Sequence, residues 1–135
     1  MNIRLALAKD IEKIIKYDKH IKKSILVNSI ANNYVYIVEE NNIFIGWLRY
    51  NLFWDNTPFM NMLYILDDYQ NKGYGKALVV FWENNMKLLG YNMLLTSTQD
   101  NETAKYFYEK LGYKVVGEFM LPKDSLELIY CKELD

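Results

Sequence analysis

Cysteine, proline and histidine are scarce in this sequence of 135 residues, with one, two and one copies respectively. Because Cys131 stands alone, an intramolecular disulfide and cysteine-rich metal sites are both excluded. A single free thiol suits a reducing compartment, so we expect a cytoplasmic protein with no bound metal. Pro58 and Pro122 are isolated, so no proline-rich linker divides the chain.

Long hydrophobic runs are also missing. Charged residues interrupt every apolar stretch well before it reaches the length of a membrane span, and residues 1–10 lack the apolar core of an export signal. The formal net charge of -1 gives no overall attraction to polyanions. Lys13, Lys16, Lys22 and Lys23 are interpreted as a solvated helix face. We therefore expect neither a membrane nor a nucleic acid as partner.

Hydrophobic residues nevertheless make up 51% of the chain, which is enough for one core of ordinary size. We predict a single domain, residues 1–135. Its first half is predicted to contain a strand, two helices, a hairpin and a further apolar strand. The expected ranges are Ile3–Ala6, a helix capped by Asp10, a helix over Ser24–Asn32, hairpin strands Tyr34–Glu39 and Ile43–Trp54 around Asn41 and Asn42, and a strand over Phe59–Leu66.

The second half alternates helices with strands. A long helix with Ala77, Leu78, Phe81, Trp82, Leu88 and Leu89 on one face is predicted to end at Gly90. A buried strand over Tyr91–Thr98 follows. Asn101 then caps a helix that carries Ala104, Phe107, Tyr108 and Leu111 on one side and ends at Gly112. Two strands, Tyr113–Phe119 and Leu126–Lys132, complete a mixed α/β order.

A glycine-bearing loop lies between the strand ending near Leu66 and the long helix. It reads Gln70, Asn71, Lys72, Gly73, Tyr74, Gly75, Lys76. Such a turn directs consecutive backbone N–H groups and the positive end of the helix dipole toward one point, which favours phosphate binding. The spacing matches neither the Walker loop nor the full dinucleotide fingerprint.

Two blocks of sequence carry a resemblance to a known family. The stretch "LYILDDYQNKGYGKAL" and, after one further helix and strand, the stretch "NETAKYFYEKLGY" stand in the order found in the GCN5-related N-acetyltransferases. The chain resembles that family over nearly all of its length. The resemblance implies a central, mostly antiparallel twisted sheet of about six to seven strands, flanked by about four helices and splayed at the cofactor site.

The resemblance also implies a reaction and its residues. It implies transfer of an acetyl group from acetyl-CoA to a primary amine of a small molecule or peptide, by direct attack in a ternary complex. Leu63, Tyr64 and Ile65 would line the pantetheine arm, with the Ile65 N–H facing the thioester oxygen. Residues 70–76 would wrap the pyrophosphate. Asn101 would help to hold the cofactor, and Tyr108, expected to have an ordinary pKa near 10, would protonate the leaving thiolate.

Neither the general base nor the acceptor site is fixed by the sequence. Thr96 and Asn61 stand where relatives carry a glutamate, and His20 lies in a polar stretch that is expected to be exposed. A water molecule or one of three carboxylates remains possible as the base, namely Asp55, Glu118 and Glu127. Some of four aromatic residues on the hairpin strand, Trp47, Tyr50, Phe53 and Trp54, are candidates for an acceptor wall, although such residues are more often core.

Two other functions compete with catalysis. The first is a non-catalytic acyl-CoA sensor that keeps the fold and the cofactor site, and the second is a nucleotide-binding protein that uses only the glycine loop. The sequence leaves open whether the protein is a monomer or a homodimer.

Overall fold

The computed structural model describes residues 1–135 and contains a seven-stranded sheet with the order β1-β2-β3-β4-β5-β7-β6. The strands are β1 (Asn2–Leu5), β2 (Val35–Glu40), β3 (Ile43–Phe53), β4 (Thr57–Ile65), β5 (Met93–Gln99), β6 (Lys114–Phe119) and β7 (Glu127–Glu133). The helices are α1 (Ile11–Tyr17), α2 (Lys23–Ala31), α3 (Tyr74–Leu88) and α4 (Ala104–Lys110), with short 3-10 turns η1 (Ala8–Asp10) and η2 (Asp67–Tyr69).

The predicted fold class is confirmed, since antiparallel pairs dominate and four helices accompany the sheet. Antiparallel pairing joins β1 to β2, β2 to β3, β5 to β7 and β6 to β7, whereas β4 and β5 are parallel. By internal contacts the chain divides into two compact units: Met1–Asn51 with Met62–Trp82, and Leu52–Asn61 with Glu83–Asp135. No helix of the chain is long and apolar enough to cross a membrane.

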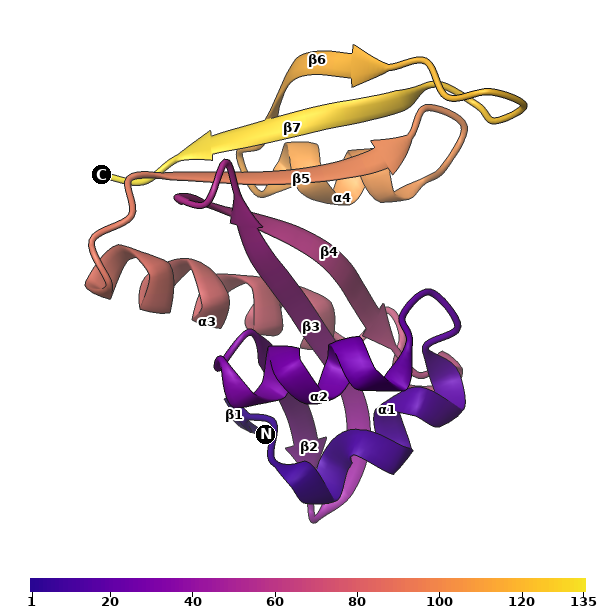
Figure 1. Ribbon diagram of the computed structural model, residues 1–135, viewed down its shortest axis with the longest axis vertical. Helices are drawn as coiled ribbons and strands as arrows, with labels where there is room; N and C mark the ends of the chain where they lie inside the picture. Colours follow the sequence, from indigo (N-terminus) through magenta and orange to yellow (C-terminus); the bar gives the residue numbers. More distant parts are fainter. The chain divides into compact units, whose positions relative to one another are not determined.

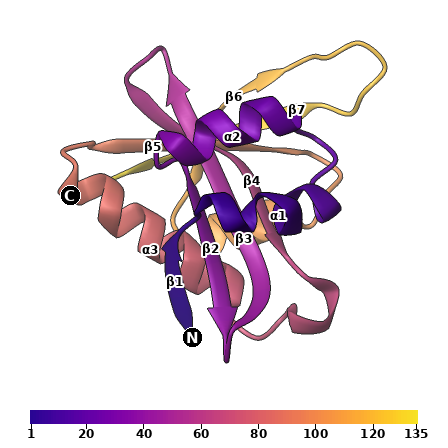
Figure 2. The ribbon, with the colours of Figure 1, turned by 60° about the horizontal axis from the view of Figure 1, so that its bottom comes forward.

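The first unit is built around the antiparallel strands β1, β2 and β3. Helices α1 and α2 cover one face of these strands (Figure 2). Between the two layers lies a cluster of apolar side chains: Ala6, Ile14, Leu26, Ile30, Val35, Ile37 and Trp47. Asn41 and Asn42 have positive φ angles of 52° and 63°, so the predicted tight hairpin between β2 and β3 is confirmed.

A buried ion pair fixes the turn between α1 and α2. Asp18 is 2% exposed, and its carboxylate accepts hydrogen bonds from Arg49 Nε at 2.8 Å and from Trp47 Nε1 at 3.2 Å. Burial opposes ionisation of this carboxyl, but the bonds from Arg49 and from the His20 N–H outweigh it and lower the pKa of Asp18. These bonds hold Asp18, directly after α1, against β3.

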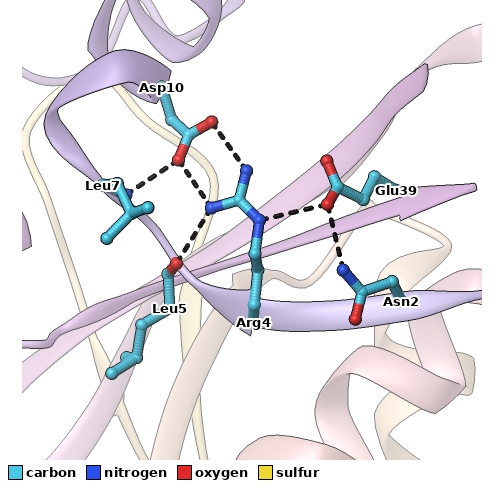
Figure 3. A network of polar contacts seen from close by, with 6 residues as sticks. All are labelled: Asn2, Arg4, Leu5, Leu7, Asp10 and Glu39. Carbon is cyan, nitrogen blue, oxygen red and sulfur yellow. Dashed lines mark hydrogen bonds and ion pairs between the residues drawn. The ribbon is translucent and has the colours of Figure 1, made fainter. Parts of the chain in front are cut away.

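Asp10 has a different role from the predicted one. Its side chain makes no cap bond to α1 and instead accepts the Leu7 N–H at 2.8 Å, closing the η1 turn that precedes the helix. Arg4 donates to both Asp10 oxygens, at 2.8 and 3.0 Å, and to Glu39 at 3.1 Å (Figure 3). The carboxylate is turned toward Arg4 on β1, so it joins the first strand to the first turn rather than starting α1.

Replacing Asp10 with asparagine is expected to lower the free energy of unfolding at pH 7 by about 2 kcal/mol, because a buried bidentate partner of Arg4 loses its charge. Burial of Asp10 raises its pKa, but the bonds from Arg4 and Leu7 outweigh burial and leave the pKa lowered. Its stabilising effect is therefore present above the pKa of the unfolded chain, about 3.9, and is lost as the pH falls.

Urea unfolding of the parent and of Asp10→Asn at pH 7 and pH 3 measures this contribution. The difference between the two proteins should be large at pH 7 and smaller at pH 3. A difference that does not change with pH would contradict the assignment of the charge to this pair.

Helix α3 buries one face and ends as predicted at Gly90, which has a positive φ of 96°. Its buried side chains are Leu78, Val79, Trp82, Glu83 and Met86. The placement of Leu88 and Leu89 on this face was wrong, since they are 85% and 67% exposed. At 100° per residue Leu88 turns away from the face defined by Trp82 and Met86, and Leu89 follows the last helical residue.

The second unit contains β5, β7 and β6 side by side, with α4 along one face of this part of the sheet (Figure 1). Its core includes Leu94, Tyr108, Tyr113 and Tyr130. Asn101 does not cap α4, because a turn over residues 100–103 intervenes and Thr103 occupies the cap position without a side-chain bond. Gly112 has a positive φ of 93° and ends the helix as predicted.

Candidate functional site

The carboxy-terminal half of β4 carries three of the predicted cofactor-binding residues. Ile65 is buried, Leu63 is partly buried and Tyr64 is 37% exposed. Gly46 on β3 allows an unusually close approach here, because a Cβ at this position would lie 2.4 Å from the Tyr64 carbonyl oxygen. The Leu66 N–H then donates to the Ile45 carbonyl at 2.8 Å. Backbone packing against β3 therefore fixes the position of Tyr64 and Ile65.

Side-chain bonds tie the end of β4 to the loop that follows. Tyr64 donates its hydroxyl proton to Asp67 at 2.7 Å, and the Gln70 amide donates to the Ile65 carbonyl at 2.8 Å. Gln70 thus turns back toward the strand. These two bonds hold the loop against the end of β4 at Ile65.

Two positive φ angles shape the loop itself. Asn71 has a φ of 62° and Gly73 a φ of 89°. A Cβ built on Gly73 would have no protein atom within 4 Å, so the space beside this residue is open. The glycine is needed for its backbone conformation, and the open space leaves room for a ligand against the backbone.

The start of α3 has the character of an anion site. Tyr74, Gly75 and Lys76 form its first turn, which contains no acidic residue. Lys72 Nζ lies 5.9 Å from the centre of the Tyr69 ring. Tyr74 donates its hydroxyl proton to Glu40, and this hydrogen bond raises the pKa of Tyr74. Exposed N–H groups, the helix dipole and two lysines together suit a pyrophosphate.

A pocket of about 330 Å³ lies beside this loop. Its lining residues are Tyr17, Tyr64, Leu66, Asp67, Asp68 and Tyr69. Of the four aromatic residues considered for an acceptor wall, Trp47 and Tyr50 are core residues with 1% and 5% exposure. These two side chains therefore do not form an open wall. Phe53 packs against Trp54 with ring centres 4.5 Å apart, and Trp54 is exposed. Tyrosine rings with carboxylates, as found in the pocket, are the chemistry that favours a cation.

Tyr108, the predicted acid, is a buried residue of α4. Its ring lies 5.7 Å from that of Tyr113 and 6.2 Å from that of Tyr130. Burial raises the pKa of Tyr108 to about 12, opposed by a hydrogen bond with Thr96 and reinforced by the charge of Glu102. The expected ordinary pKa near 10 was therefore wrong, because a phenolate in this apolar setting loses hydration.

The other predicted residues of the second unit lie on its surface. Asn101 and Glu118 are exposed, Glu127 is partly exposed, and Asp55 is exposed in the turn between β3 and β4 with a φ of 64°. In the first unit, His20 is exposed, as expected from its polar surroundings. None of these side chains is distinguished as a base by burial or by a charged partner.

Sequence reasoning overlooked two residues. No sequence pattern singles out Gly46, because only the close approach of another strand, distant in the sequence, requires a residue without a Cβ at this position. Thr96 was considered only as a base, yet it is 1% exposed and donates to the Met60 carbonyl at 3.0 Å. A threonine in the middle of an apolar strand is the pattern that marks such a buried hydroxyl.

Comparison with known proteins identifies the family to which the chain is similar. A family model described as an acetyltransferase (GNAT) domain matches residues 31–115, more than half of the chain. No curated protein matches the sequence.

Solved structures show the same fold at low sequence identity. Ard1 from Thermoplasma volcanium has a TM-score of 0.84 at 13% identity, covering 98% of this chain and 97% of that one. The paia N-acetyltransferase from Thermoplasma acidophilum, solved in complex with coenzyme A, has a TM-score of 0.81 at 20% identity, covering 98% of both chains. A GNAT-family acetyltransferase from Bacillus cereus has a TM-score of 0.79 at 20% identity, covering 98% and 96%.

Proposed function

The chain belongs to the GNAT acetyltransferase domain family, and from this premise we propose that it transfers an acetyl group from acetyl-CoA to a primary amine of a small molecule or peptide. The observation that carries the proposal is the loop between β4 and α3. Its Gly73 presents open backbone at a φ of 89° before a helix whose first turn has no acidic residue. Open backbone at a helix N-terminus favours the binding of a CoA pyrophosphate.

We assign the cofactor contacts to three groups of residues. Leu63, Tyr64 and Ile65 line the pantetheine arm, residues 70–76 hold the pyrophosphate, and Asn101 and Tyr108 complete the site. The Gln70 bond to the Ile65 carbonyl supports this assignment, because it fixes the strand end relative to the loop. The Ile65 N–H is then a preorganised donor for the thioester oxygen.

The proposed reaction is a direct attack in a ternary complex. The amine nitrogen forms a bond to the thioester carbon, and the Ile65 N–H stabilises the oxyanion that develops. The carbon–sulfur bond then breaks, and Tyr108 gives its proton to the departing thiolate. The amine loses one proton to a base, either water or a carboxylate among Asp55, Glu118 and Glu127.

The proposal extends to the setting of the enzyme. Residues 1–135 act as one N-acetyltransferase domain, in the cytoplasm and as a monomer or homodimer. The pocket lined by Tyr17, Tyr64, Asp67, Asp68 and Tyr69 suits an acceptor that carries positive charge.

Calorimetric titration of the purified protein with acetyl-CoA, CoA and ATP tests the proposal. Acetyl-CoA and CoA are expected to bind well, and ATP much more weakly, because ATP lacks the pantetheine arm that β4 would hold. Preferential binding of ATP would contradict the proposal and favour a nucleotide-binding protein. A panel of amines monitored by thiol release then separates an enzyme from a sensor, since acyl-CoA binding with no thiol release for any amine would support the sensor.

A further inference from the structure

Glu83 is a buried carboxylate that the proposed reaction does not use. It lies on α3, is 7% exposed and belongs to the second compact unit. Its two oxygens accept hydrogen bonds from the Tyr113 hydroxyl at 2.7 Å and from Lys132 Nζ at 3.1 and 3.2 Å. Because an unpaired buried charge is costly, a carboxylate at this position needs such donors. Glu83 therefore joins α3 to β7 and to the residue that follows the end of α4.

Tyr113 is held at both of its ends. Its backbone N–H donates to the Tyr108 carbonyl at 3.0 Å, and the Gly112 N–H donates to the Glu109 carbonyl at 3.1 Å. Together with the positive φ of Gly112, 93°, these two bonds form the Schellman motif that ends α4. At the other end of the side chain, the hydroxyl is bonded to Glu83. The ring between them is 2% exposed and is thereby fixed relative to the last turn of α4.

The fixed ring of Tyr113 supports the ring of Tyr108. The two ring centres are 5.7 Å apart and their planes meet at 66°, the edge-to-face geometry that aromatic pairs favour. Tyr113 thus contacts Tyr108 at its ring and at its carbonyl oxygen. Tyr130 is a second neighbour of the Tyr108 ring, at 6.2 Å, but its hydroxyl has no hydrogen-bond partner. Of these two neighbours, only Tyr113 is anchored by a side-chain hydrogen bond.

Stability alone does not require a carboxylate at position 83. Well-packed apolar side chains often replace a buried ion pair without loss of stability. An apolar residue cannot supply the directional bond that gives the Tyr113 ring one position. Position matters for a proton donor, because a displacement of about 1 Å near the reacting atoms can lower the rate by about 100-fold.

We propose that Glu83 is a positioning residue for Tyr108 and acts through Tyr113, an inference that rests on the proposed role of Tyr108 as the acid. Lys132 completes the arrangement, since its Nζ pairs with the carboxylate and lies 5.6 Å from the centre of the Tyr113 ring. Glu83 contacts neither Tyr108 nor the assigned cofactor residues directly. Its effect on the reaction is the placement of the Tyr108 phenol relative to the departing thiolate.

Two substitutions remove the bond between Glu83 and Tyr113 from opposite sides. Tyr113→Phe keeps the ring and removes the donor, and Glu83→Leu keeps an apolar side chain of similar length and removes the acceptor. Each should lower kcat about tenfold and leave the Kd for acetyl-CoA within about twofold of the parent. Glu83→Gln keeps an acceptor oxygen for Tyr113 and should retain kcat within about threefold. Tyr130→Phe is the matched control, since it removes the hydroxyl without a partner, and it should retain kcat within about twofold.

A double-mutant cycle and a resonance separate positioning from a general effect on folding. In a Tyr108→Phe background, Tyr113→Phe should have almost no further effect on kcat, because the proton that is positioned is already gone. In protein labelled with 13C at tyrosine Cζ, the Tyr108 resonance is identified by its loss in Tyr108→Phe. It should shift in Glu83→Leu and stay nearly in place in Tyr130→Phe. Should Glu83→Leu not fold, Tyr113→Phe provides the same measurement.

An equally large loss of kcat in the Tyr108→Phe background, or an unshifted Tyr108 resonance in Glu83→Leu, would overturn the proposal. Lower stability of Tyr113→Phe toward urea with unchanged kcat would also overturn it, because a purely structural bond behaves in this way. If the parent fails to bind acetyl-CoA, or if Tyr108→Phe keeps full activity, the proposed function fails instead. The Tyr108 resonance in Glu83→Leu then decides by itself whether Glu83 positions Tyr108.

Discussion

Replacing Tyr108 with phenylalanine is expected to lower kcat about 100-fold while leaving the Kd for acetyl-CoA nearly unchanged. Phenylalanine keeps the ring that packs against Tyr113 and Tyr130 and removes only the proton donor. The loss should therefore appear in the chemical step. Single-turnover measurements of thiol release, combined with calorimetric titration of acetyl-CoA, separate the two quantities.

The raised pKa of Tyr108 is compatible with this role. Moving a proton from a phenol of pKa about 12 to a thiolate of pKa about 8.5 is uphill by about 5 kcal/mol. A turnover of about 10 per second corresponds to a barrier of about 16 kcal/mol, so the step fits within it. Because the pKa is raised, Tyr108 stays protonated at all ordinary pH values, and no loss of activity between pH 7 and pH 10 should come from its ionisation.

Tyr130 provides a matched control for this substitution. It is a fully buried tyrosine whose hydroxyl has no hydrogen-bond partner, and its ring is a neighbour of Tyr108. Tyr130→Phe should leave kcat within about twofold and should not reduce stability, because a buried hydroxyl without a partner contributes little. Full activity in Tyr108→Phe would remove the proposed acid, and an equal loss in both variants would indicate a packing effect.

Local patterns in the sequence predicted most of the helices and strands and several of their ends. The hairpin was predicted from Asn41 and Asn42 and the helix ends from Gly90 and Gly112, because in each case a residue tolerant of positive φ stands where the chain must turn. Hydrophobic periodicity located most of the strands and helices. It failed at Leu88, which turns away from the buried face of α3, and at Leu89, which follows the last helical residue.

Tertiary contacts decided the details that sequence reasoning missed. Asp10 and Asn101 each precede a helix and resemble caps, but Arg4 holds the first carboxylate, and Asn101 lies within a turn over residues 100–103 that places Thr103 at the cap position of α4. The raised pKa of Tyr108 depends on burial that is created by residues distant in the sequence. The roles assigned to the motif residues stay predictions, which substitutions of Tyr108 and Gly73 test.

Replacing Gly73 with valine is expected to weaken acetyl-CoA binding by roughly 30- to 100-fold, through the loss of one or two charge-assisted bonds to the pyrophosphate. The residue has a φ of 89°, and no protein atom lies within 4 Å of the position its Cβ would take. A side chain there meets no protein group but occupies the space proposed for the ligand. Calorimetric titration with acetyl-CoA measures the effect, and urea unfolding measures the accompanying strain.

Gly90 at the other end of α3 separates that strain from the loss of binding. Its φ of 96° and the open space around its Cβ match those of Gly73, so valine should cost about the same conformational energy at either position, roughly 1–3 kcal/mol. Only Gly73→Val should also lose affinity, because Gly90 follows the last turn of the helix and has no assigned ligand. If Gly73→Val binds acetyl-CoA as well as Gly90→Val does, the pyrophosphate does not lie against this loop. Alanine at both positions repeats the comparison with a smaller side chain should valine prevent folding.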